Sequence, residues 1–208
     1  MIGKTFYLPF KAELRYFIDN RLHKQYLISK NITYPKRPSP IGKQPKGLLA
    51  KVFNVKLTEI LAPEDPSFSI VIPKIGANAR ITASVDAADE KVYLNALKKG
   101  VAQAAGTAFP GEGGHIFLFA HSTDYFWNVG SYNAVFYLIY KLERGDEINI
   151  FFQGRRYVYK MVDKKIVDSN QVEYLTRKTN KEFLTLQTCW PPGTTLKRLL
   201  VMATRATE

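Results

Sequence analysis

The 208-residue sequence contains a single cysteine, Cys189, so no disulfide can form within the chain. A small secreted domain stapled by disulfides is thereby excluded. The sequence also lacks a run of ~18 apolar residues, the length that crosses a bilayer as a helix. Its opening segment is interrupted by Lys4, Lys11 and Arg15 and therefore lacks the apolar stretch of a signal peptide.

Acidic residues are scarce near the N-terminus. Residues 1–60 contain twelve Lys or Arg and three Asp or Glu, whereas residues 61–208 contain eighteen and fifteen. Most of the net charge of +12 therefore belongs to the N-terminal segment. A basic arm favours an anionic partner such as lipid headgroups, a cell-wall polymer or nucleic acid. A solvated basic segment without a specific partner is an equally good interpretation.

The N-terminal segment combines a helical pattern with a proline-rich stretch. Apolar residues recur at helical spacing from Phe10 to Leu22 and predict a helix around residues 10–29. The stretch NITYPKRPSPIGKQPKG follows, and its composition is typical of a linker or an extended arm. We therefore predict a basic appendage over residues 1–58, helical in part, and a second domain over residues 59–208.

The second domain has the patterns of short strands. FSIVIPKIGANARITASV is rich in Ile and Val and predicts one or two strands broken at Pro73–Gly76. DAADEKVYLNALKKGVAQAAG begins with acidic residues, and its periodic part ends at Lys98–Gly100, which predicts a helix. GHIFLFAHS, KEFLTLQTCW and LKRLLVMATR predict further strands, and residues 132–167 predict a short helix and a hairpin turning at Gln153–Gly154. Seven or eight short strands favour a mainly β domain that forms a closed or nearly closed barrel.

Three residues suited to acyl transfer stand at the ends of predicted strands. Cys189 ends TLQTC, His121 ends a strand upstream, and Arg198 begins the last strand nine residues after the cysteine. A thiolate can act as a nucleophile, an imidazole can protonate a leaving amine, and a guanidinium can stabilise an oxyanion. The PPGTT turn can return the last strand beside the cysteine. Taken singly, however, a core cysteine, a satisfied strand-end histidine and a surface arginine explain the three residues better.

The segments around these residues resemble the sortase family. TLQTC followed by Arg198 is similar to the TLxTC segment and catalytic arginine of sortases. IPKIGANARI, NALKKGVAQAAGTAFPGEGGHIFLFAHS and GSYNAVFYLIYKLERGDEI resemble three further sortase segments, the second of which ends at the catalytic histidine. The similarity spans residues 66–205 in order. It implies a sortase-type β-barrel with Cys189 as nucleophile, assisted by His121 and Arg198, and with Thr188 contributing to the oxyanion site through its backbone.

Four positions depart from the family pattern. Ala120 and His115 stand where sortases commonly have glycine and asparagine, and Gln103 replaces a histidine. Trp190 follows the cysteine where small or polar residues are commoner. None of these changes removes a catalytic group, but they blur the assignment to a sortase class. The PPGTT turn is most similar to classes D and E.

The resemblance implies cleavage of an LPxTG-type sorting signal after its threonine, through a thioacyl-enzyme on Cys189. The acyl group would then pass to an amine of a cell-wall precursor or of a pilin lysine. A thiol hydrolase that uses water as acceptor remains an alternative, as does a non-catalytic peptide-binding module on the same fold. We expect loops 163–182 and 190–197 to border the groove. The expected groove residues are Ala104, Thr107, Val167, Leu175, Trp190 and Pro191.

We expect no required metal, and modulation by calcium stays open. Glu112, Asp163 and Asp168 are candidate ligands, but hard cations need more oxygen atoms than this set supplies convincingly. The resemblance also implies a location at the extracytoplasmic face of the cell membrane, with an N-terminal anchor that is not present in this chain. The basic arm would then face an anionic membrane or wall polymer, and no nucleic-acid partner is expected. EDPSF, residues 64–68, is similar to the lid of pilin-type sortases, but its place against the first strand favours a structural role.

Overall fold

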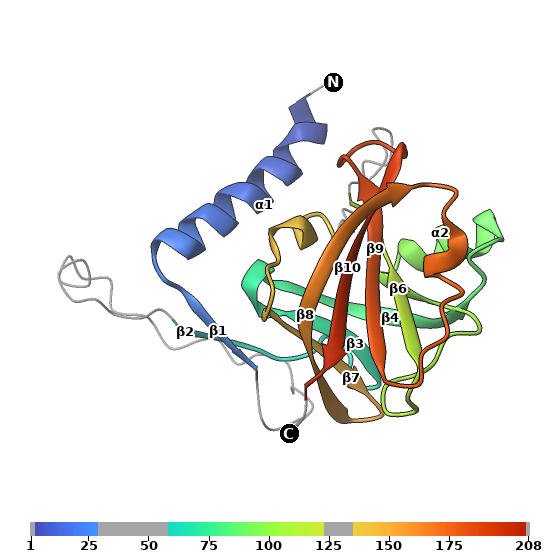
Figure 1. Cartoon of the computed structure of the whole chain (residues 1–208). Coiled ribbons are helices and arrows are strands. Elements are labelled where there is room, and N and C mark those ends of the chain that lie inside the picture. Colours follow the sequence, from blue (N-terminus) through green and yellow to red (C-terminus); the bar gives the residue numbers. More distant parts are fainter. Residues whose placement is uncertain (1–2, 29–57, 123–134, 207–208) are drawn as a thin grey trace, which may run out of the picture.

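A computed structural model describes residues 3–28, 58–122 and 135–206 of the chain (Figure 1). The strands of its main sheet are β3 (Phe68–Ile72), β4 (Ala77–Val85), β5 (Val101–Ala104), β6 (His115–Phe119), β7 (Glu147–Phe152), β8 (Arg155–Asp168), β9 (Phe183–Trp190) and β10 (Lys197–Arg205). They form a closed barrel in the order β10-β8-β7-β3-β4-β5-β6-β9. The predicted mainly β barrel of seven or eight strands is therefore confirmed, with eight strands in a closed barrel.

Short helical elements connect the strands. They are η2 (Pro73–Ile75), α2 (Glu90–Leu97), η3 (Ile139–Lys141) and η4 (Val172–Tyr174). The predicted helix near residue 90 is confirmed, and the Asp89 side chain caps it by accepting a hydrogen bond from the Val92 amide at 3.1 Å. The predicted break between β3 and β4 is also confirmed, because η2 occupies it.

The N-terminal segment forms a helix and a small ribbon beside the barrel. Helix α1 spans Gly3–Arg21, and β1 (Gln25–Ile28) pairs in parallel with β2 (Thr58–Leu61). The predicted helix over residues 10–29 is thus wrong at both ends. It ends early because His23 adopts a positive φ of 49°, and the Lys24 amide then bonds to the Asp19 carbonyl at 2.9 Å. The predicted domain boundary falls within β2 and stays a prediction.

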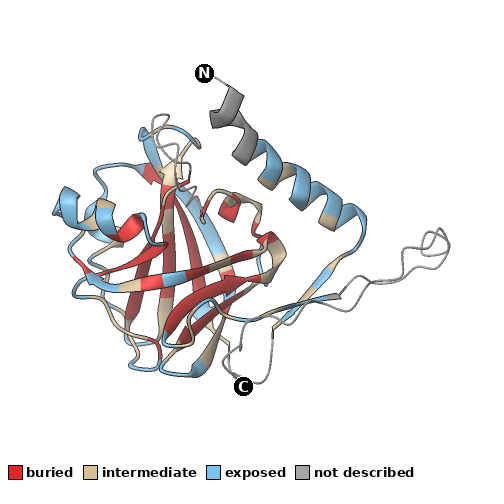
Figure 2. Ribbon diagram, turned by 180° about the vertical axis from the view of Figure 1, so that it is seen from behind, coloured by how far each residue is buried: buried red, intermediate tan, exposed pale blue. Residues whose placement is uncertain are grey.

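Alternation along the strands divides the side chains between two apolar clusters. The main cluster fills the barrel, and β9 and β10 supply Leu184, Leu186, Leu199 and Val201 to it. A smaller cluster lies on the outer face of β4–β6, where α2 covers Phe117 and its neighbours. Figure 2 shows the buried positions concentrated in the barrel strands, whereas α1 is largely exposed. The outward-facing side chains of the other strands are therefore available to form a surface site.

Two connections differ from the predicted ones. Residues 101–104, which follow the predicted end of the helix at Lys98–Gly100, were not predicted to be a strand, but they form β5 beside β4. Strand β8 extends to Asp168, so the segment before the cysteine strand covers residues 169–182 rather than 163–182. The connection between β9 and β10 likewise covers residues 191–196. Among the described residues, no helix combines the length and the apolarity needed to span a bilayer.

Candidate active site

Three adjacent strands bring the predicted catalytic residues into one row. Cys189 of β9 and Arg198 of β10 are directly paired across the antiparallel ladder. Strand β6 runs parallel to β9 with Phe119 opposite Gln187. Continuing that register by two residues places His121 opposite Cys189. Since neighbouring strands lie about 4.8 Å apart, the three residues occupy adjacent positions at one end of the barrel.

Hydrogen bonds beyond the end of β6 support this register. The Ala120 amide donates to the Gln187 carbonyl at 3.1 Å. The buried Thr188 hydroxyl donates to the Ala120 carbonyl at 2.9 Å, which ties the cysteine strand to the residue before His121. The Thr188 side chain is therefore a structural link between the two strands. The predicted oxyanion role of its backbone stays a prediction.

The row lies on the outer face of the barrel. Leu184 and Leu186 of β9 point into the core, so the alternation along the strand directs Cys189 outward. Arg198 likewise alternates with Leu199, which faces the core. The Cys189 side chain is partly buried rather than fully enclosed. A nucleophile in this position is held by the sheet and is still open to a substrate that lies across the strands.

Burial and charge act in opposite directions on the cysteine. Burial raises the pKa of the Cys189 thiol above its ordinary value, and the positive charge of Arg198 opposes that rise. Burial is the larger effect, so the resting group is a neutral thiol at physiological pH. Formation of the nucleophilic thiolate therefore requires a proton acceptor, and His121 on the neighbouring strand can serve as one.

The Arg198 guanidinium is tethered to its own loop. Its Nη1 atom donates to the carbonyl oxygens of Thr195 and Lys197 at 3.0 and 3.1 Å. The loop is closed by Thr194, whose amide and hydroxyl both donate to the Pro191 carbonyl, at 3.0 and 2.8 Å. These bonds engage one nitrogen of a group with five N–H donors. The guanidinium can thus keep its place in the row while it donates to a substrate oxygen.

Comparisons with known proteins agree with this arrangement. A sequence model of the Sortase domain matches residues 70–206. The chain belongs to the sortase family. Sortase D of Bacillus subtilis strain 168 is 32% identical over 139 residues, which cover 65% of this chain and 62% of that protein. This chain therefore matches less than two thirds of the length of that relative.

Solved sortase structures share the fold. Sortase C-1 from Actinomyces oris is 28% identical, with a TM-score of 0.56 over 70% of this chain and 76% of that one. A structure of Clostridium perfringens sortase C with the C-terminal cell wall sorting motif is 29% identical, with a TM-score of 0.54 over 67% and 70% of the two chains. The similar proteins include class C and class D enzymes, so the predicted class of this sortase stays a prediction.

The expected groove residues occupy different environments in this sortase. Val167 of β8 is the direct partner of Arg198 and extends the row, but its side chain is buried. Ala104 is also buried, in the outer apolar cluster, against which Leu175 packs. The Thr107 hydroxyl donates to the Ala104 carbonyl at 2.8 Å. Ala104 is thus buried, and Thr107 and Leu175 are partly buried. Contact of these three residues with a substrate stays a prediction.

Trp190 and Pro191, the two residues after the cysteine, differ in their exposure to solvent. The Trp190 side chain packs against the barrel core and lies on the opposite face of β9 from Cys189. Pro191 is exposed at the start of the next loop. Trp190 therefore covers the end of the barrel, whereas Pro191 borders the row of catalytic candidates from the loop.

Glu112, Asp163 and Asp168, the carboxylates considered for calcium, do not form a common ligand group among the described residues. Glu112 accepts a hydrogen bond from the Phe109 amide at 2.9 Å, and Asp168 lies 3.8 Å from the Lys197 ammonium. Asp163 accepts from the Lys164 amide at 2.9 Å. Within the described parts of the chain, no three His, Cys, Asp or Glu side chains form a group that could hold a metal ion. The absence of a metal requirement stays a prediction.

The EDPSF segment lies at the other end of the barrel. Asp65 accepts from the Ser67 amide at 2.8 Å and forms an ion pair with Arg80 at 3.0 Å. The Pro66 carbonyl accepts from the amide of Gly154 in the β7–β8 hairpin at 3.0 Å. Strand β8 runs from that hairpin to the level of Cys189, so the segment is separated from the site by the length of the barrel. Its expected structural role fits these contacts.

Sequence reasoning missed one neighbour of the site. The Tyr140 ring, in η3, packs against Trp190 with ring centroids 5.6 Å apart. The Tyr140 hydroxyl donates to Glu13 of α1. The two residues are 127 positions apart in the chain, and neither carries a local signal of this contact. The N-terminal helix is thereby connected to the end of the cysteine strand.

Proposed function

We propose that this sortase is a cysteine transpeptidase that cleaves an LPxTG-type sorting signal after its threonine. The new carboxyl end is joined to an amine, either of a cell-wall precursor or of a pilin lysine. The observation that supports this proposal is the row of His121, Cys189 and Arg198 on three adjacent strands. A nucleophile, a proton donor and an oxyanion ligand are needed together for acyl transfer, and the row supplies all three.

The first half-reaction forms a thioacyl-enzyme. The Cys189 thiolate attacks the carbonyl carbon of the scissile threonine, and the carbonyl oxygen becomes an oxyanion. Arg198 donates hydrogen bonds to that oxygen and stabilises its charge. When the intermediate collapses, the bond to the glycine nitrogen breaks and His121 protonates the departing amine. The products are a thioester on Cys189 and the released C-terminal peptide.

The second half-reaction restores the enzyme. The acceptor amine attacks the thioester carbonyl, and His121 removes a proton from the attacking nitrogen. The carbon–sulfur bond then breaks and returns the thiolate, while a new amide bond remains. Since Cys189 is a neutral thiol at rest, only the fraction with thiolate and imidazolium together is active, which is consistent with modest turnover.

Support for a peptide substrate comes from the similar fold of Clostridium perfringens sortase C, which was solved with the C-terminal cell wall sorting motif. A library of LPxTG-like peptides, with and without an amine such as triglycine, tests the proposal. The wild type should form the transpeptidation product, and mass spectrometry should detect an acyl adduct on Cys189. Equal turnover by Cys189→Ala would rule out the nucleophile.

The hydrolase alternative differs only in the acceptor. It uses the same thioester, so cleavage by itself does not distinguish the two activities. Release of the free acid alone, at every amine concentration tested, would favour the hydrolase. A product ratio that shifts to the amide as amine increases would favour the transpeptidase. Stoichiometric peptide binding without any acyl adduct would instead favour the non-catalytic module.

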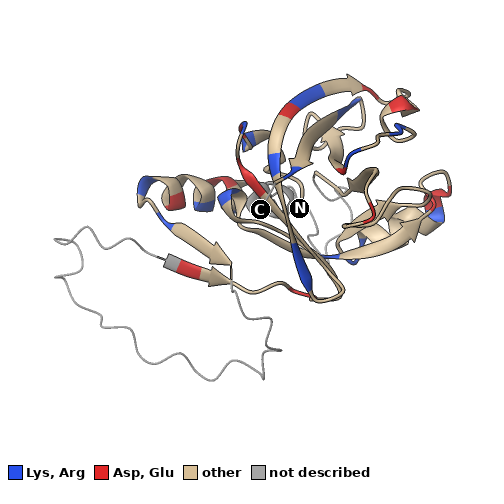
Figure 3. Ribbon diagram, turned by 60° about the horizontal axis from the view of Figure 1, so that its bottom comes forward, with Lys and Arg blue, Asp and Glu red and all other residues tan. Residues whose placement is uncertain are grey.

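We further propose that the protein acts at the extracytoplasmic face of the cell membrane, with its basic arm towards an anionic membrane or wall polymer. Helix α1 supports this orientation. Its acidic residues, Glu13 and Asp19, are both engaged by protein groups, through Tyr140 and Tyr26. The basic side chains of Lys11 and Arg21 remain exposed. Figure 3 shows both basic and acidic positions along α1. With both acidic side chains engaged, the exposed charges of the described helix are basic.

A further inference from the structure

The inner side of α1 is docked on the barrel beside the catalytic end. Ala12 and Tyr16 pack against the main core cluster. The Arg15 Nη2 atom donates to the Ile75 carbonyl of η2 at 2.8 Å. A Cβ atom at Gly76 would lie 2.9 Å from that nitrogen, so the glycine leaves room for the arginine. Helix α1 therefore has a defined seat rather than a loose contact.

Glu13 makes the polar contacts between α1 and η3. Its carboxylate accepts a hydrogen bond from the Tyr140 hydroxyl and lies 3.5 Å from the Lys141 ammonium. Lys141 also lies over the rings of Tyr16 and Tyr140, at 5.4 and 4.9 Å from their centroids. Burial, and then the bond to Glu13, raise the pKa of Tyr140, so its hydroxyl remains a donor throughout the physiological range.

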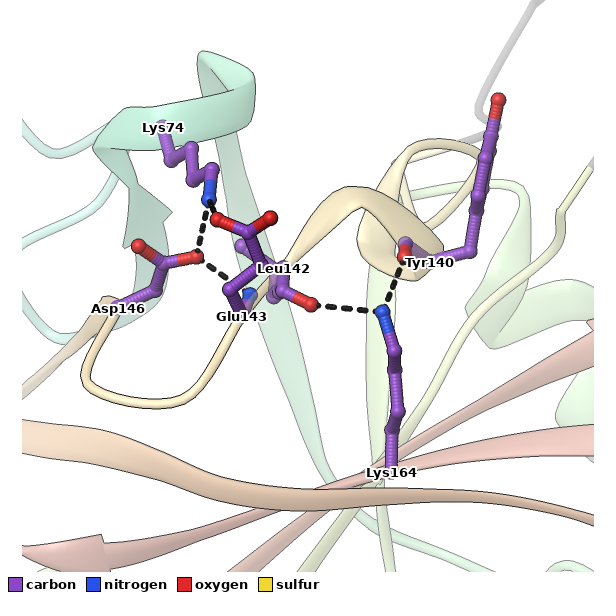
Figure 4. A network of polar contacts seen from close by, with 6 residues as sticks. All are labelled: Lys74, Tyr140, Leu142, Glu143, Asp146 and Lys164. Atoms are coloured by element: carbon purple, nitrogen blue, oxygen red, sulfur yellow. Dashed lines mark hydrogen bonds and ion pairs between the residues drawn. The ribbon is translucent and has the colours of Figure 1, made fainter.

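The backbone beneath Tyr140 is fixed independently of α1 (Figure 4). Lys164 of β8 donates to the carbonyl oxygens of Tyr140 and Leu142 at 2.8 and 2.9 Å. Lys74 of η2 bridges the carboxylates of Glu143 and Asp146 at 2.6 and 2.8 Å. With the backbone held in this way, the orientation of the Tyr140 ring depends on the partners of its side chain.

Those partners include the Glu13 carboxylate, the Lys141 ammonium and the rings of Tyr137 and Trp190. The Tyr140 and Trp190 rings meet at 54° with centroids 5.6 Å apart. Trp190 is bonded to Cys189 along the chain and also packs against the core. A displaced Trp190 ring would shift the end of β9, and a shift of about 1 Å can change a rate a hundredfold when reacting groups must be aligned.

We propose that α1 positions the nucleophile: Glu13 orients Tyr140, Tyr140 holds Trp190, and Trp190 fixes Cys189 relative to His121 and Arg198. These are positioning residues, because none of them touches the reacting atoms. The inference rests on the proposed use of Cys189 as a nucleophile. It adds that the basic appendage contributes to the competence of the barrel's active site.

The test uses the full chain carrying Trp127→Phe, so that Trp190 is its only tryptophan. Glu13→Gln and Tyr140→Phe are introduced separately. We expect each to change the Trp190 emission maximum and to lower both the iodoacetamide reaction rate of Cys189 and kcat about three- to tenfold, the equivalent of one lost hydrogen bond. KM for the peptide should change less than about twofold, because the substrate contacts remain.

A matched control comes from the same helix. Tyr26 of β1 donates a hydrogen bond to Asp19 of α1, again from a phenol to a carboxylate. Tyr26 lies in the β1–β2 ribbon, and its described side-chain contacts are with Asp19 and Lys24. Tyr26→Phe should leave the emission, the thiol reactivity and kcat unchanged. If Tyr140→Phe does not fold, the nearly isosteric Glu13→Gln tests the same link from the helix side.

Two results would overturn the proposal. One is an altered Trp190 emission with unchanged thiol reactivity and kcat, which would make the link merely structural. The other is an equal loss in the Tyr26→Phe control, which would trace the effect to general destabilisation. Iodoacetamide needs no peptide, so the link can be tested even if the wild type turns over no sorting signal. Failure of the proposed function and failure of this inference are therefore separate outcomes.

Discussion

At the scale of single residues, burial and the charge of Arg198 act in opposite directions on the pKa of the Cys189 thiol. Burial keeps the thiol protonated, whereas the guanidinium favours the thiolate. The same arginine is tethered to the carbonyl oxygens of its loop at rest. Arg198 therefore has two separable effects, one on the charge state of the nucleophile and one on the oxyanion, and pH dependence distinguishes them.

Arg198→Ala should raise the pKa of Cys189 further, because it removes the charge that opposes burial. In the wild type, the iodoacetamide reaction rate should rise with pH through a midpoint above the ordinary thiol value of about 8.5. The midpoint should move upward in Arg198→Ala and stay close to the wild-type value in Arg198→Lys. A midpoint that falls in the alanine variant would contradict this account of the thiol.

A second titrating residue acts on stability rather than on catalysis. His115 is 5% exposed, and one ring nitrogen lies 2.9 Å from the Thr185 hydroxyl. Burial, assisted by the nearby Arg177, lowers the pKa of His115 from 6.5 to about 4. The folded state thus binds fewer protons than the unfolded chain between these values. Stability is present above pH 6.5 and is lost as the pH falls through this window.

His115→Asn should remove this acid sensitivity, because asparagine stays neutral. The wild type should lose up to ~3 kcal/mol of unfolding free energy between pH 7 and pH 4 through this residue. Urea unfolding at several pH values measures the loss, and His23→Asn on the exposed turn after α1 is the control. Identical pH slopes for the wild type and His115→Asn would show that His115 is not responsible.

At the scale of elements, Glu182, which lies just before β9, contacts the β5–β6 loop, β8 and β10. Its carboxylate accepts from the amide of Gly111 in the β5–β6 loop at 3.0 Å and from the hydroxyl of Tyr159 of β8. It also lies 4.0 Å from Arg205 of β10. Tyr159 is fully buried, and the Glu182 carboxylate is the hydrogen-bond acceptor that the structure gives for its hydroxyl.

Glu182→Ala should therefore destabilise the fold by about 1–3 kcal/mol, the penalty for leaving a buried hydroxyl without its acceptor. The double variant Glu182→Ala, Tyr159→Phe should lose less than the sum of the single variants, because the two groups interact. Thermal and urea unfolding measure both effects. The exposed Glu173→Ala serves as control and should change stability by less than about 0.5 kcal/mol. Strict additivity in the double variant would contradict the proposed pairing.

The elements also show where sequence reasoning succeeds. Strands β9 and β10 were predictable because alternation and the PPGTT turn define them, and Cys189 and Arg198 stand at their ends. Strand β5 was missed because its four-residue VAQA sequence has little β propensity, although the helix before it was predicted to stop at Lys98–Gly100. The end of α1 was missed because His23, not glycine, takes the left-handed conformation.

At the scale of the whole molecule, the contact between α1 and the barrel was beyond sequence reasoning. Glu13 and Tyr140 are 127 residues apart, and their pairing depends on the way the closed barrel presents η3. The row of catalytic candidates was accessible because family spacing links all three strands. The link to the appendage has no such spacing, and only the packed structure relates α1 to η3.

The outer face of α1 has a separate consequence for location. Four large apolar side chains of the helix are exposed, from 43% for Ile18 to 65% for Phe10, while Ala12 and Tyr16 face the barrel. The other two are Leu14 and Phe17, and Leu22, just after the helix, is exposed as well. A helix with one apolar side and basic neighbours is suited to the interface of an anionic bilayer. A hydrophilic wall polymer would leave these apolar groups in water.

The full chain should therefore co-sediment with vesicles that contain phosphatidylglycerol and bind much less to pure phosphatidylcholine. Phe10→Ser with Phe17→Ser should weaken binding at least about tenfold, because two large side chains no longer leave water. Val172→Ser is the matched control, since Val172 and Phe17 are both 63% exposed but Val172 lies in η4 on the barrel. Equal binding by the double variant would assign the attraction to charge alone. A dimer that forms without lipid and is lost in the double variant would assign the apolar face to a second copy of the chain.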